Sequence, residues 1–172
     1  MHGFHNLKVH FMKKIIFALT FVTLIASASG TFAQRKIVGG EIAAGARFGG
    51  QSGLTLKKYK NSNRAALEAI AGWNFDNSIK GFALTGLFEK LAPLNSNGQL
   101  SGQFGFGATA IFGDKFYLGP TGILGFDWRV KKFPVTMSVD WMPTWILIGT
   151  SKFSSLNGAF SVRYIINHKK FD

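Results

Sequence analysis

The sequence contains no cysteine and has few charged residues, and both shortages narrow the chemistry that the protein can perform. Without cysteine there is no disulfide, no thiolate nucleophile and no cysteine-based metal site. Charged residues make up 16% of the 172 residues, against about a quarter in a typical soluble domain. Phenylalanine and glycine are instead abundant, at 18 and 21 residues. The length fits one domain of ordinary size.

A long apolar run is also missing once the N-terminal region is passed, which excludes membrane-spanning helices there. Sparse charge and many aromatic residues without such a run are typical of a membrane β-barrel. The composition therefore favours a chain that crosses a membrane with strands.

The N-terminal region has the charged, apolar, small-residue order of a secretory signal peptide. Lys13 and Lys14 precede an apolar run over residues 15–26, and Thr31-Phe32-Ala33 follows a group of small residues. We expect cleavage after Ala33, with Ala28 as second choice, and Met12 as the true start. An uncleaved membrane anchor is the alternative. The sequence thus predicts a signal peptide over residues 1–33 and a mature domain over residues 34–172.

Acidic residues are scarce, with 8 against 20 lysines and arginines, which gives a formal net charge of +12. Nucleic-acid binding is one interpretation of a basic chain. The basic residues are scattered among loops, however, and do not gather on one element. We therefore expect no nucleic-acid partner, and we expect basic loops and turns to be attracted to anionic lipid head groups.

The stretch over residues 119–145 shows the strand pattern most clearly. It alternates strictly with period two in two arms that are joined by a short basic turn. Large apolar side chains occupy one face, and small, polar or charged side chains occupy the other. The apolar set is Leu124, Phe126, Trp128, Val130, Val135, Met137, Val139 and Trp141. Such a hairpin suits a barrel whose apolar face meets lipid and whose polar face lines the interior.

The same alternation recurs along the chain and predicts eight strands, over residues 43–49, 54–59, 64–73, 81–89, 100–112, 117–130, 134–141 and 159–167. Residues 64–73 have good helix formers, so a helix is the alternative there. Longer connections are expected over Lys90–Gln99 and Trp145–Gly158. The fold class is therefore all-β: an eight-stranded antiparallel up-and-down transmembrane β-barrel after a cleaved signal peptide.

An even number of strands places both chain ends in the periplasm, together with the turn at Lys131-Lys132-Phe133. The Trp145–Gly158 connection then faces the outside, where loops are normally longer. The long Lys90–Gln99 connection falls on the periplasmic side and breaks that rule. The strand count therefore stays open by one hairpin.

The charged residues on the predicted inner face are equal in number for the two signs. They are Arg47, Lys57, Arg129, Arg163, Glu68, Glu89, Asp127 and Asp140. The interior of an eight-stranded barrel is about wide enough for side chains to fill it, and a buried charge needs a partner. The balance predicts an interior charge network that plugs the barrel. A narrow gated or ion-conducting path through that network is the alternative.

Catalytic sets are poorly represented, so we do not expect an enzyme. His2, His5 and His10 precede the signal peptide, and only His168 follows it, beyond the last strand. A serine–histidine site thus has one poor candidate. Asp127 and Asp140 could form a carboxylate pair, but Arg129 beside them favours salt bridges. We expect no cofactor and no metal, because the ligands are missing.

Six aromatic residues lie near predicted strand ends: Trp73, Tyr117, Trp128, Trp141, Trp145 and Tyr164. In a membrane protein they would form two interfacial belts. In a soluble lipocalin-like barrel they would be core residues, and the same strands would be turned inside out. Membrane fractionation separates the two interpretations.

Several segments together resemble a family of small, largely uncharacterised outer-membrane β-barrel proteins of Gram-negative bacteria. The segments are GARFGG, GLTLKKY, RAALEAIAGW, GFALTGLFEK, FSVRYII and the 119–145 hairpin, whose GFDW and DWMP ends are the most specific pieces. The resemblance covers nearly all of the mature chain. It implies the barrel, an outer-membrane location and help from the barrel-assembly machinery, and it brings no substrate or catalytic residue.

One departure concerns the C-terminus. Such chains usually end on the aromatic residue that closes the last strand, whereas Arg163-Tyr164-Ile165-Ile166 continues here into Asn-His-Lys-Lys-Phe-Asp. The last strand therefore ends either at Ile166 or at Phe171. Taken together, the sequence predicts a monomeric outer-membrane barrel in contact with outer-membrane lipid, with a structural or surface-interaction role. A narrow porin-like channel and a soluble lipocalin-like barrel are the alternatives.

Overall fold

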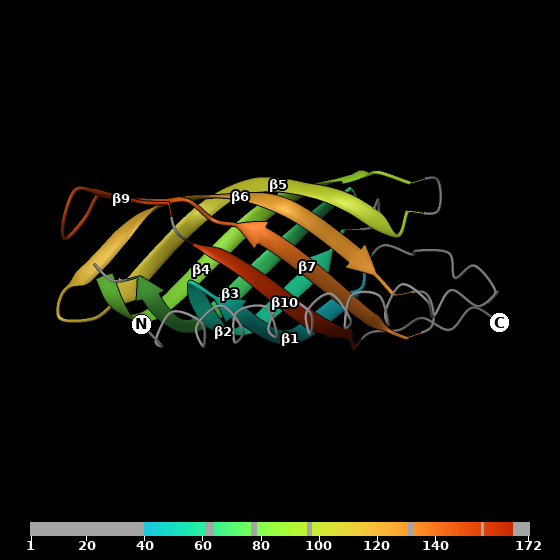
Figure 1. Ribbon diagram of the computed structural model, residues 1–172, viewed down its shortest axis with the longest axis horizontal. Helices are drawn as coiled ribbons and strands as arrows, with labels where there is room; N and C mark the ends of the chain where they lie inside the picture. Colours follow the sequence, from blue (N-terminus) through green and yellow to red (C-terminus); the bar gives the residue numbers. More distant parts are fainter. Residues whose placement is uncertain are drawn as a thin grey trace, which may run out of the picture. The chain divides into compact units, whose positions relative to one another are not determined.

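Eight strands close into one antiparallel barrel in the computed structural model, which describes residues 40–60, 64–76, 79–95, 98–130, 133–155 and 157–166 (Figure 1). The wall consists of β1 (Ile42–Gly49), β2 (Gln51–Tyr59), β3 (Ala65–Asp76), β4 (Ile79–Pro93), β5 (Leu100–Phe112), β6 (Phe116–Arg129), β7 (Val135–Trp141) and β10 (Gly158–Ile165). Each strand pairs with the next, and β1 pairs with β10 to complete the ring. The predicted fold class is thereby confirmed as a closed eight-stranded barrel. The predicted signal peptide lies outside the described residues.

The helix that residues 64–73 could have formed is not found, because β3 covers this stretch and pairs with both β2 and β4. The described residues contain no helix long and apolar enough to cross a membrane.

Three strands are longer than predicted by more than one residue. β2 starts at Gln51 and not at residue 54. β3 runs to Asp76 and β4 starts at Ile79, so the loop predicted over residues 74–80 is reduced to its centre. β4 also continues to Pro93 and takes up the start of the predicted Lys90–Gln99 connection. In both places the ladder to the neighbouring strand continues past the polar residues that suggested a turn.

The predicted Trp145–Gly158 loop contains two short strands, β8 (Thr144–Ile146) and β9 (Lys152–Ser154), which pair with each other. β8 also pairs with β6, through Thr144 and Thr121. This pair continues the register in which Trp141 of β7 pairs with Leu124 of β6, because both partners are shifted by three residues. β8 therefore continues the line of β7 after a break at Met142-Pro143, where the proline has no N–H to give to the ladder. The predicted long connection is therefore present, and it contains a short hairpin that the sequence analysis did not predict.

The two ends of the barrel differ, and we name them by what they carry. The terminal end holds Gly40 and Ile166, where the Ile166 N–H donates to the carbonyl of Ile42 at 2.8 Å. The hairpin end holds the β1–β2 turn, the β5–β6 turn at residues 113–115 and the β8–β9 hairpin, the last two of which lie on the left of Figure 1. Both ends of the described chain thus lie at one end of the barrel.

Side chains alternate between the two faces of the wall along every strand of the barrel. Large apolar residues point outward, with Phe126 at 56%, Val139 at 58% and Phe106 at 70% exposure. The inner face holds the charged residues, and Asp127 and Arg163 are at most 2% exposed. The polarity of the barrel is therefore inverted relative to a soluble protein, in which large apolar groups are mostly buried.

Three apolar clusters fill parts of the interior at different heights. One lies at the terminal end and includes Tyr59, Leu91 and Ile165. A second occupies the middle, built from Ile70, Leu87, Ile123 and Met142. The third lies at the hairpin end and consists of Ile79, Ala83, Ile111 and Ile146, the last of which comes from β8. Polar side chains fill the space between these clusters.

Candidate functional site

The charged interior is centred on Lys57 of β2, whose side chain is fully buried. Its ammonium nitrogen Nζ lies 2.7 Å from Glu89 Oε2, 3.2 Å from Asp127 Oδ2 and 3.6 Å from Glu68 Oε2. It also donates to Gln103 Oε1 at 2.9 Å. These partners come from β3, β4, β5 and β6, so one lysine joins five strands of the wall. We call Lys57, its three carboxylates and Arg163 the ionic cluster.

Arg163 of β10 also joins the cluster, from a strand that only β1 separates from β2. Its guanidinium pairs with Glu68, and its Nε and Nη1 atoms donate to Thr55 at 3.0 Å and to Ser138 at 2.9 Å. The hydroxyl of Thr55 in turn donates to Glu68 Oε1 at 2.5 Å. Glu68 therefore bridges the two cations. Hydrogen bonds to charged partners of this kind are among the stronger ones in proteins.

Room for these side chains comes from glycine on the neighbouring strand. Gly105 of β5 lies opposite Glu89 in the sheet register. A Cβ at this glycine would stand 2.1 Å from the carbonyl oxygen of Phe88 and 2.8 Å from the Glu89 Cα. Only a glycine fits this close approach. The inner face of β5 therefore leaves space beside Glu89 and contributes Gln103 as its polar group at this level.

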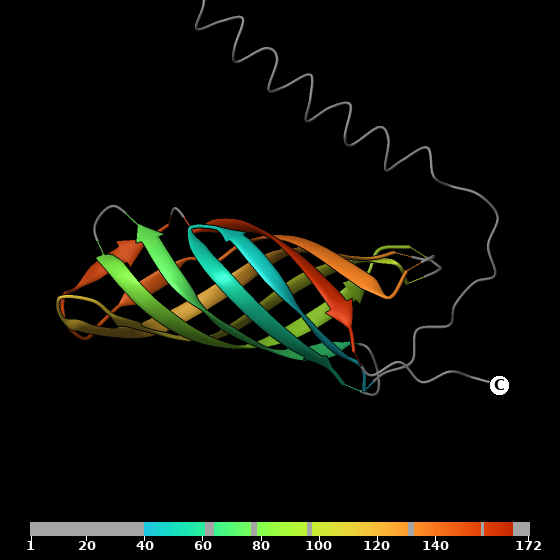
Figure 2. The same ribbon diagram turned by 90° about the horizontal axis from the view of Figure 1, so that it is seen from below.

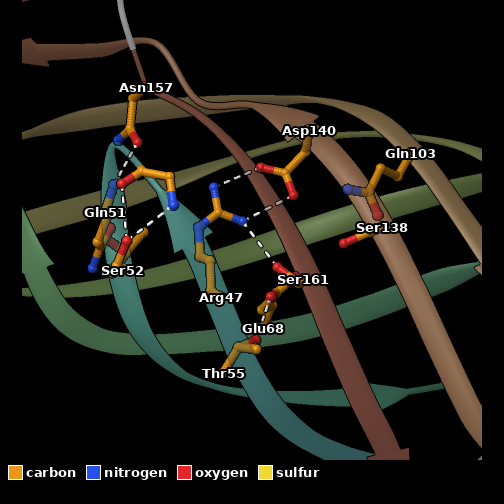
Figure 3. A network of polar contacts seen from close by, with 12 residues as sticks. Arg47, Gln51, Ser52, Thr55, Glu68, Gln103, Ser138, Asp140, Asn157 and Ser161 are labelled. Atoms are coloured by element: carbon orange, nitrogen blue, oxygen red, sulfur yellow. Dashed lines mark hydrogen bonds and ion pairs between the residues drawn. The ribbon is translucent and has the colours of Figure 1, made fainter. Parts of the chain in front are cut away.

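Arg47 and Asp140 form a second, separate ion pair (Figure 3). Arg47 of β1 reaches past β10 to β7, where Nη1 and Nη2 donate to the two carboxylate oxygens of Asp140 at 2.8 and 2.6 Å. Nη1 also lies 3.4 Å from the hydroxyl of Ser161 on the intervening strand. Both side chains of the pair are fully buried. The fork-to-fork arrangement satisfies both carboxylate oxygens at once.

Arg129 lies nearer the terminal end and takes a partner that the sequence analysis did not assign. Its Nη1 atom is 2.5 Å from Glu41 Oε2, and its guanidinium stacks 4.1 Å from the centre of the Tyr59 ring. The hydroxyl of Tyr59 donates to Asp127 at 2.9 Å, which connects this pair to the ionic cluster. Glu41 precedes β1 and has the same parity as its inward residues. Continuing the alternation of β1 from the inward Ala43 two residues back would have predicted Glu41 as an inward residue.

The structure thus places all eight residues of the predicted charge network on the inner face, in two connected sets and not in one. Four carboxylates and three cations among them are buried, whereas Arg129 is half-buried beside Glu41. Asp127 and Asp140 belong to different sets. They therefore do not form the carboxylate pair that could have served as an acid and a base.

A ladder of threonine hydroxyls occupies the hairpin half of the interior. Thr85, Thr109, Thr121 and Thr144 follow one another at 2.9, 2.7 and 3.0 Å, and Thr85 also donates to Gln51 Oε1 at 2.9 Å. Each hydroxyl can donate one bond and accept others. The ladder satisfies buried polar groups of β4, β5, β6 and β8 without a net charge.

Five of the six predicted interface aromatics point outward and are 37–58% exposed: Trp73, Trp128, Trp141, Trp145 and Tyr164. Trp128 and Tyr164 lie toward the terminal end, whereas Trp73 and Trp145 lie toward the hairpin end. The prediction that Tyr117 lies at the membrane interface was wrong. Its side chain packs inside the barrel against the cluster of Ile79, Ala83, Ile111 and Ile146. It shares the inward parity of Asp127 on β6, which the belt assignment overlooked.

The interior offers little space for a substrate near its polar groups. A recess at the hairpin end, lined among others by Gln51, Asn74 and Asn157, has a volume of about 10 Å³, which corresponds to roughly one water molecule. In the described part of the chain, no three histidine, aspartate or glutamate side chains are grouped so as to hold a metal ion. His168 lies outside the described residues.

Comparison with known proteins gives no relative: no family model, no curated protein and no solved structure matches the chain.

Proposed function

We propose that the chain matures into a monomeric integral outer-membrane β-barrel protein with a plugged interior and a structural or surface-interaction role. The observation that carries this proposal is the inverted polarity of the wall. Bulky side chains such as Leu54 and Phe106, at 71% and 70% exposure, cover the outside, while Arg47, Lys57 and Arg163 are completely buried. Exposing that apolar exterior to water is unfavourable in free energy, whereas contact with lipid tails carries no such cost. A soluble lipocalin-like barrel needs the opposite arrangement.

The dimensions of the wall agree with such a role. The barrel strands are seven to fifteen residues long, and a tilted strand needs about nine to eleven to cross the hydrocarbon core. The closed ring leaves no strand edge along the wall, which a bilayer requires. Trp73 and Trp145 lie toward one end and Trp128 and Tyr164 toward the other, where such residues meet head groups. Assembly of this barrel in a membrane would use the barrel-assembly machinery.

The plug is inferred from the order of layers along the interior. The ionic cluster lies between the apolar clusters around Leu91 at the terminal end and around Ile123 in the middle. A further apolar cluster around Ile111 and Ile146 lies at the hairpin end. An ion that passed through would have to cross all three and separate paired charges, each of which is costly. We therefore favour a plugged barrel over a narrow channel.

The surface-interaction part of the role belongs to the β8–β9 hairpin, which faces outward if the chain ends lie in the periplasm. Trp145 and Phe153 face each other across its two strands and are 55% and 59% exposed. Leu147 at its tip is 57% exposed. Exposed aromatic and apolar groups on a projecting element are typical of contact sites.

The location is tested by separating inner and outer membranes from cells that express the chain, followed by gel electrophoresis of heated and unheated detergent extracts. The proposal predicts recovery with the outer membrane and a heat-dependent shift in migration. A soluble lipocalin-like barrel would appear in the soluble fraction.

The plug makes a separate prediction for electrical recordings. The purified full chain, reconstituted into a planar bilayer, is expected to give no steady conductance, because paired ions and three apolar layers fill its interior. Vesicles that carry the same preparation are floated on a density gradient as the control for insertion. Discrete, sustained current steps from inserted protein would contradict the plug and establish a narrow channel.

A further inference from the structure

Four exposed basic side chains gather at the terminal end of the barrel and form what we call the basic patch. Lys58 of β2, Lys60 of the β2–β3 connection and Lys90 of β4 lie on the outer face, and Arg64 lies at the rim, just before β3. Ala65, next to Arg64, pairs with Lys90, and Leu67 lies between Lys58 and Phe88 in the register. The ammonium of Lys60 stands 5.5 Å from the centre of the Phe88 ring.

Among the described residues, the acidic side chains either have other partners or belong to the other end of the barrel. Glu41 is engaged by Arg129, and four other carboxylates lie inside the barrel. Asp76 and Asp114, the remaining acids in the part of the chain that the structure covers, belong to the hairpin end. No carboxylate of the described ranges forms an ion pair with any of the four basic residues. Their charge is therefore free for an anionic partner at a membrane surface, where each nearby lysine or arginine strengthens binding.

A hollow in the outer wall lies along the same strands, closer to the middle of the barrel. Its volume is about 680 Å³, and the small residues that line it on the outer face are Ala44, Ala69, Ala71 and Gly86. Leu54, Leu56 and Leu84 line it as well. A Cβ added at Gly86 would meet no atom within 4 Å. We call this space the outer hollow. It lies over β1 to β4, the cyan and green strands that run side by side in Figure 2.

The basic patch and the outer hollow are aligned along the strands. Lys58 follows Leu54 by four residues on β2, and Lys90 follows Gly86 by four residues on β4. Four residues of a strand span about 13 Å, which suits the distance from a phospholipid phosphate to the upper half of its acyl chain. On β5 and β6, by contrast, large exposed side chains such as Phe104 and Phe126 cover the outer wall.

We propose that this flank is a binding site for one anionic glycerophospholipid. The phosphate lies among Lys58, Lys60, Arg64 and Lys90, and one acyl chain lies in the outer hollow. The site rests on the proposed membrane location, and it goes beyond general contact with lipid because it fixes one molecule in one place. Head-group charge gives the selectivity, since a zwitterionic lipid brings no net charge to the four cations. The hollow supplies contact area to the chain.

Two pairs of variants test the site, each with a matched control. Lys58→Gln with Lys90→Gln removes two charges of the basic patch, and Lys115→Gln with Lys152→Gln removes two from the hairpin end. Gly86→Leu fills the outer hollow without a clash, and Gly102→Leu makes the same change on β5, where a Cβ has its nearest contact at 3.9 Å. All four proteins are first checked for outer-membrane location and heat-modifiable migration.

Binding is then measured by native mass spectrometry of protein released from vesicles of phosphatidylethanolamine that contain phosphatidylglycerol. Wild type is expected to retain one phosphatidylglycerol. The lysine pair is expected to weaken retention about thirtyfold, and Gly86→Leu about tenfold for any head group. Both controls are expected to behave as wild type.

The outcomes separate this inference from the proposed function. Wild type that sits in the outer membrane but retains no phosphatidylglycerol overturns the site and leaves the barrel proposal intact. Equal retention by all variants, no preference over phosphatidylethanolamine, or a dimer mass in place of a lipid adduct overturns it as well. Wild type in the soluble fraction overturns the proposed function itself, and the site with it.

Discussion

Replacing Lys57 with methionine is expected to destabilise the barrel by about 3–5 kcal/mol or more. The ammonium group lies within 3.6 Å of Glu68, Glu89 and Asp127, and all of these side chains are at most 3% exposed. Glu68 keeps Arg163 as a partner in the variant, but Glu89 loses its only cation within ion-pair distance among the described residues. Buried carboxylates without a counter-charge carry the full cost of desolvation. The midpoint of urea unfolding, measured from vesicles, should fall by at least about 1 M.

Lys115→Met is the control, because Lys115 is exposed in the β5–β6 turn and belongs neither to the ionic cluster nor to the basic patch. It should leave the unfolding midpoint close to that of wild type. If Lys57→Met does not fold, the same change combined with Glu89→Gln and Asp127→Asn should restore folding, since these substitutions remove the uncompensated charges. An unchanged midpoint for Lys57→Met would show that water reaches the ionic cluster.

The pair formed by Arg47 and Asp140 gives the second large effect, in the form of a double-mutant cycle. Arg47→Met and Asp140→Leu are each expected to cost about 3–5 kcal/mol, because each leaves one buried charge unpaired. The double variant places two apolar side chains of similar size in the same space. It should unfold close to wild type or above it, since apolar replacement of a complete buried pair is often neutral or stabilising.

The cycle is clean because, among the described residues, the Arg47 guanidinium has one carboxylate partner, Asp140, and one further side-chain partner, Ser161 at 3.4 Å. The free energies of unfolding from urea titrations of all four proteins give the coupling directly. Strict additivity of the two single costs would mean that the residues do not interact.

The sidedness of the wall could be predicted from the sequence because a strand has a period of exactly two. Once Phe126 and Asp127 are assigned to opposite faces, every other residue of β6 follows. The choice of which face is inside came from a physical argument. Equal numbers of inward acids and bases suit a closed interior, and aromatic groups suit lipid. The structure has the charged residues inside and the bulky apolar residues outside.

Partner choice could not be predicted, because it depends on the stagger of strands that lie far apart in sequence. Arg47 and Asp140 are 93 residues apart and meet across β10. Arg129 appeared to belong with Asp127 and Asp140 by proximity in the hairpin, but it pairs with Glu41, 88 residues away. Alternation gives the face of a residue, whereas the height of a residue within the barrel comes from the register of every strand between the two partners.

The errors share a related cause, which is that local turn signals were given more weight than the continuing ladder. Asn74 to Lys80 and Lys90 to Gln99 contain typical turn residues, yet β4 extends into both stretches. Pro143 ends β7, yet the chain resumes the same register in β8. Tyr117 was assigned to the interface from its residue type, although its parity on β6 placed it inside.

The most direct test of the inverted wall is the solvent that surrounds a single outward residue. Because the chain has no cysteine, Val139→Cys provides a unique site for a nitroxide spin label on the outer face of β7. Thr150→Cys, exposed in the β8–β9 hairpin, serves as the control for aqueous solvent. In bilayer vesicles, an outward face in lipid predicts that oxygen relaxes the label at residue 139 strongly and that a water-soluble nickel complex does not reach it. The label at residue 150 is expected to be relaxed mainly by the nickel complex. A label at residue 139 that the nickel complex reaches as readily as at residue 150 would contradict the account.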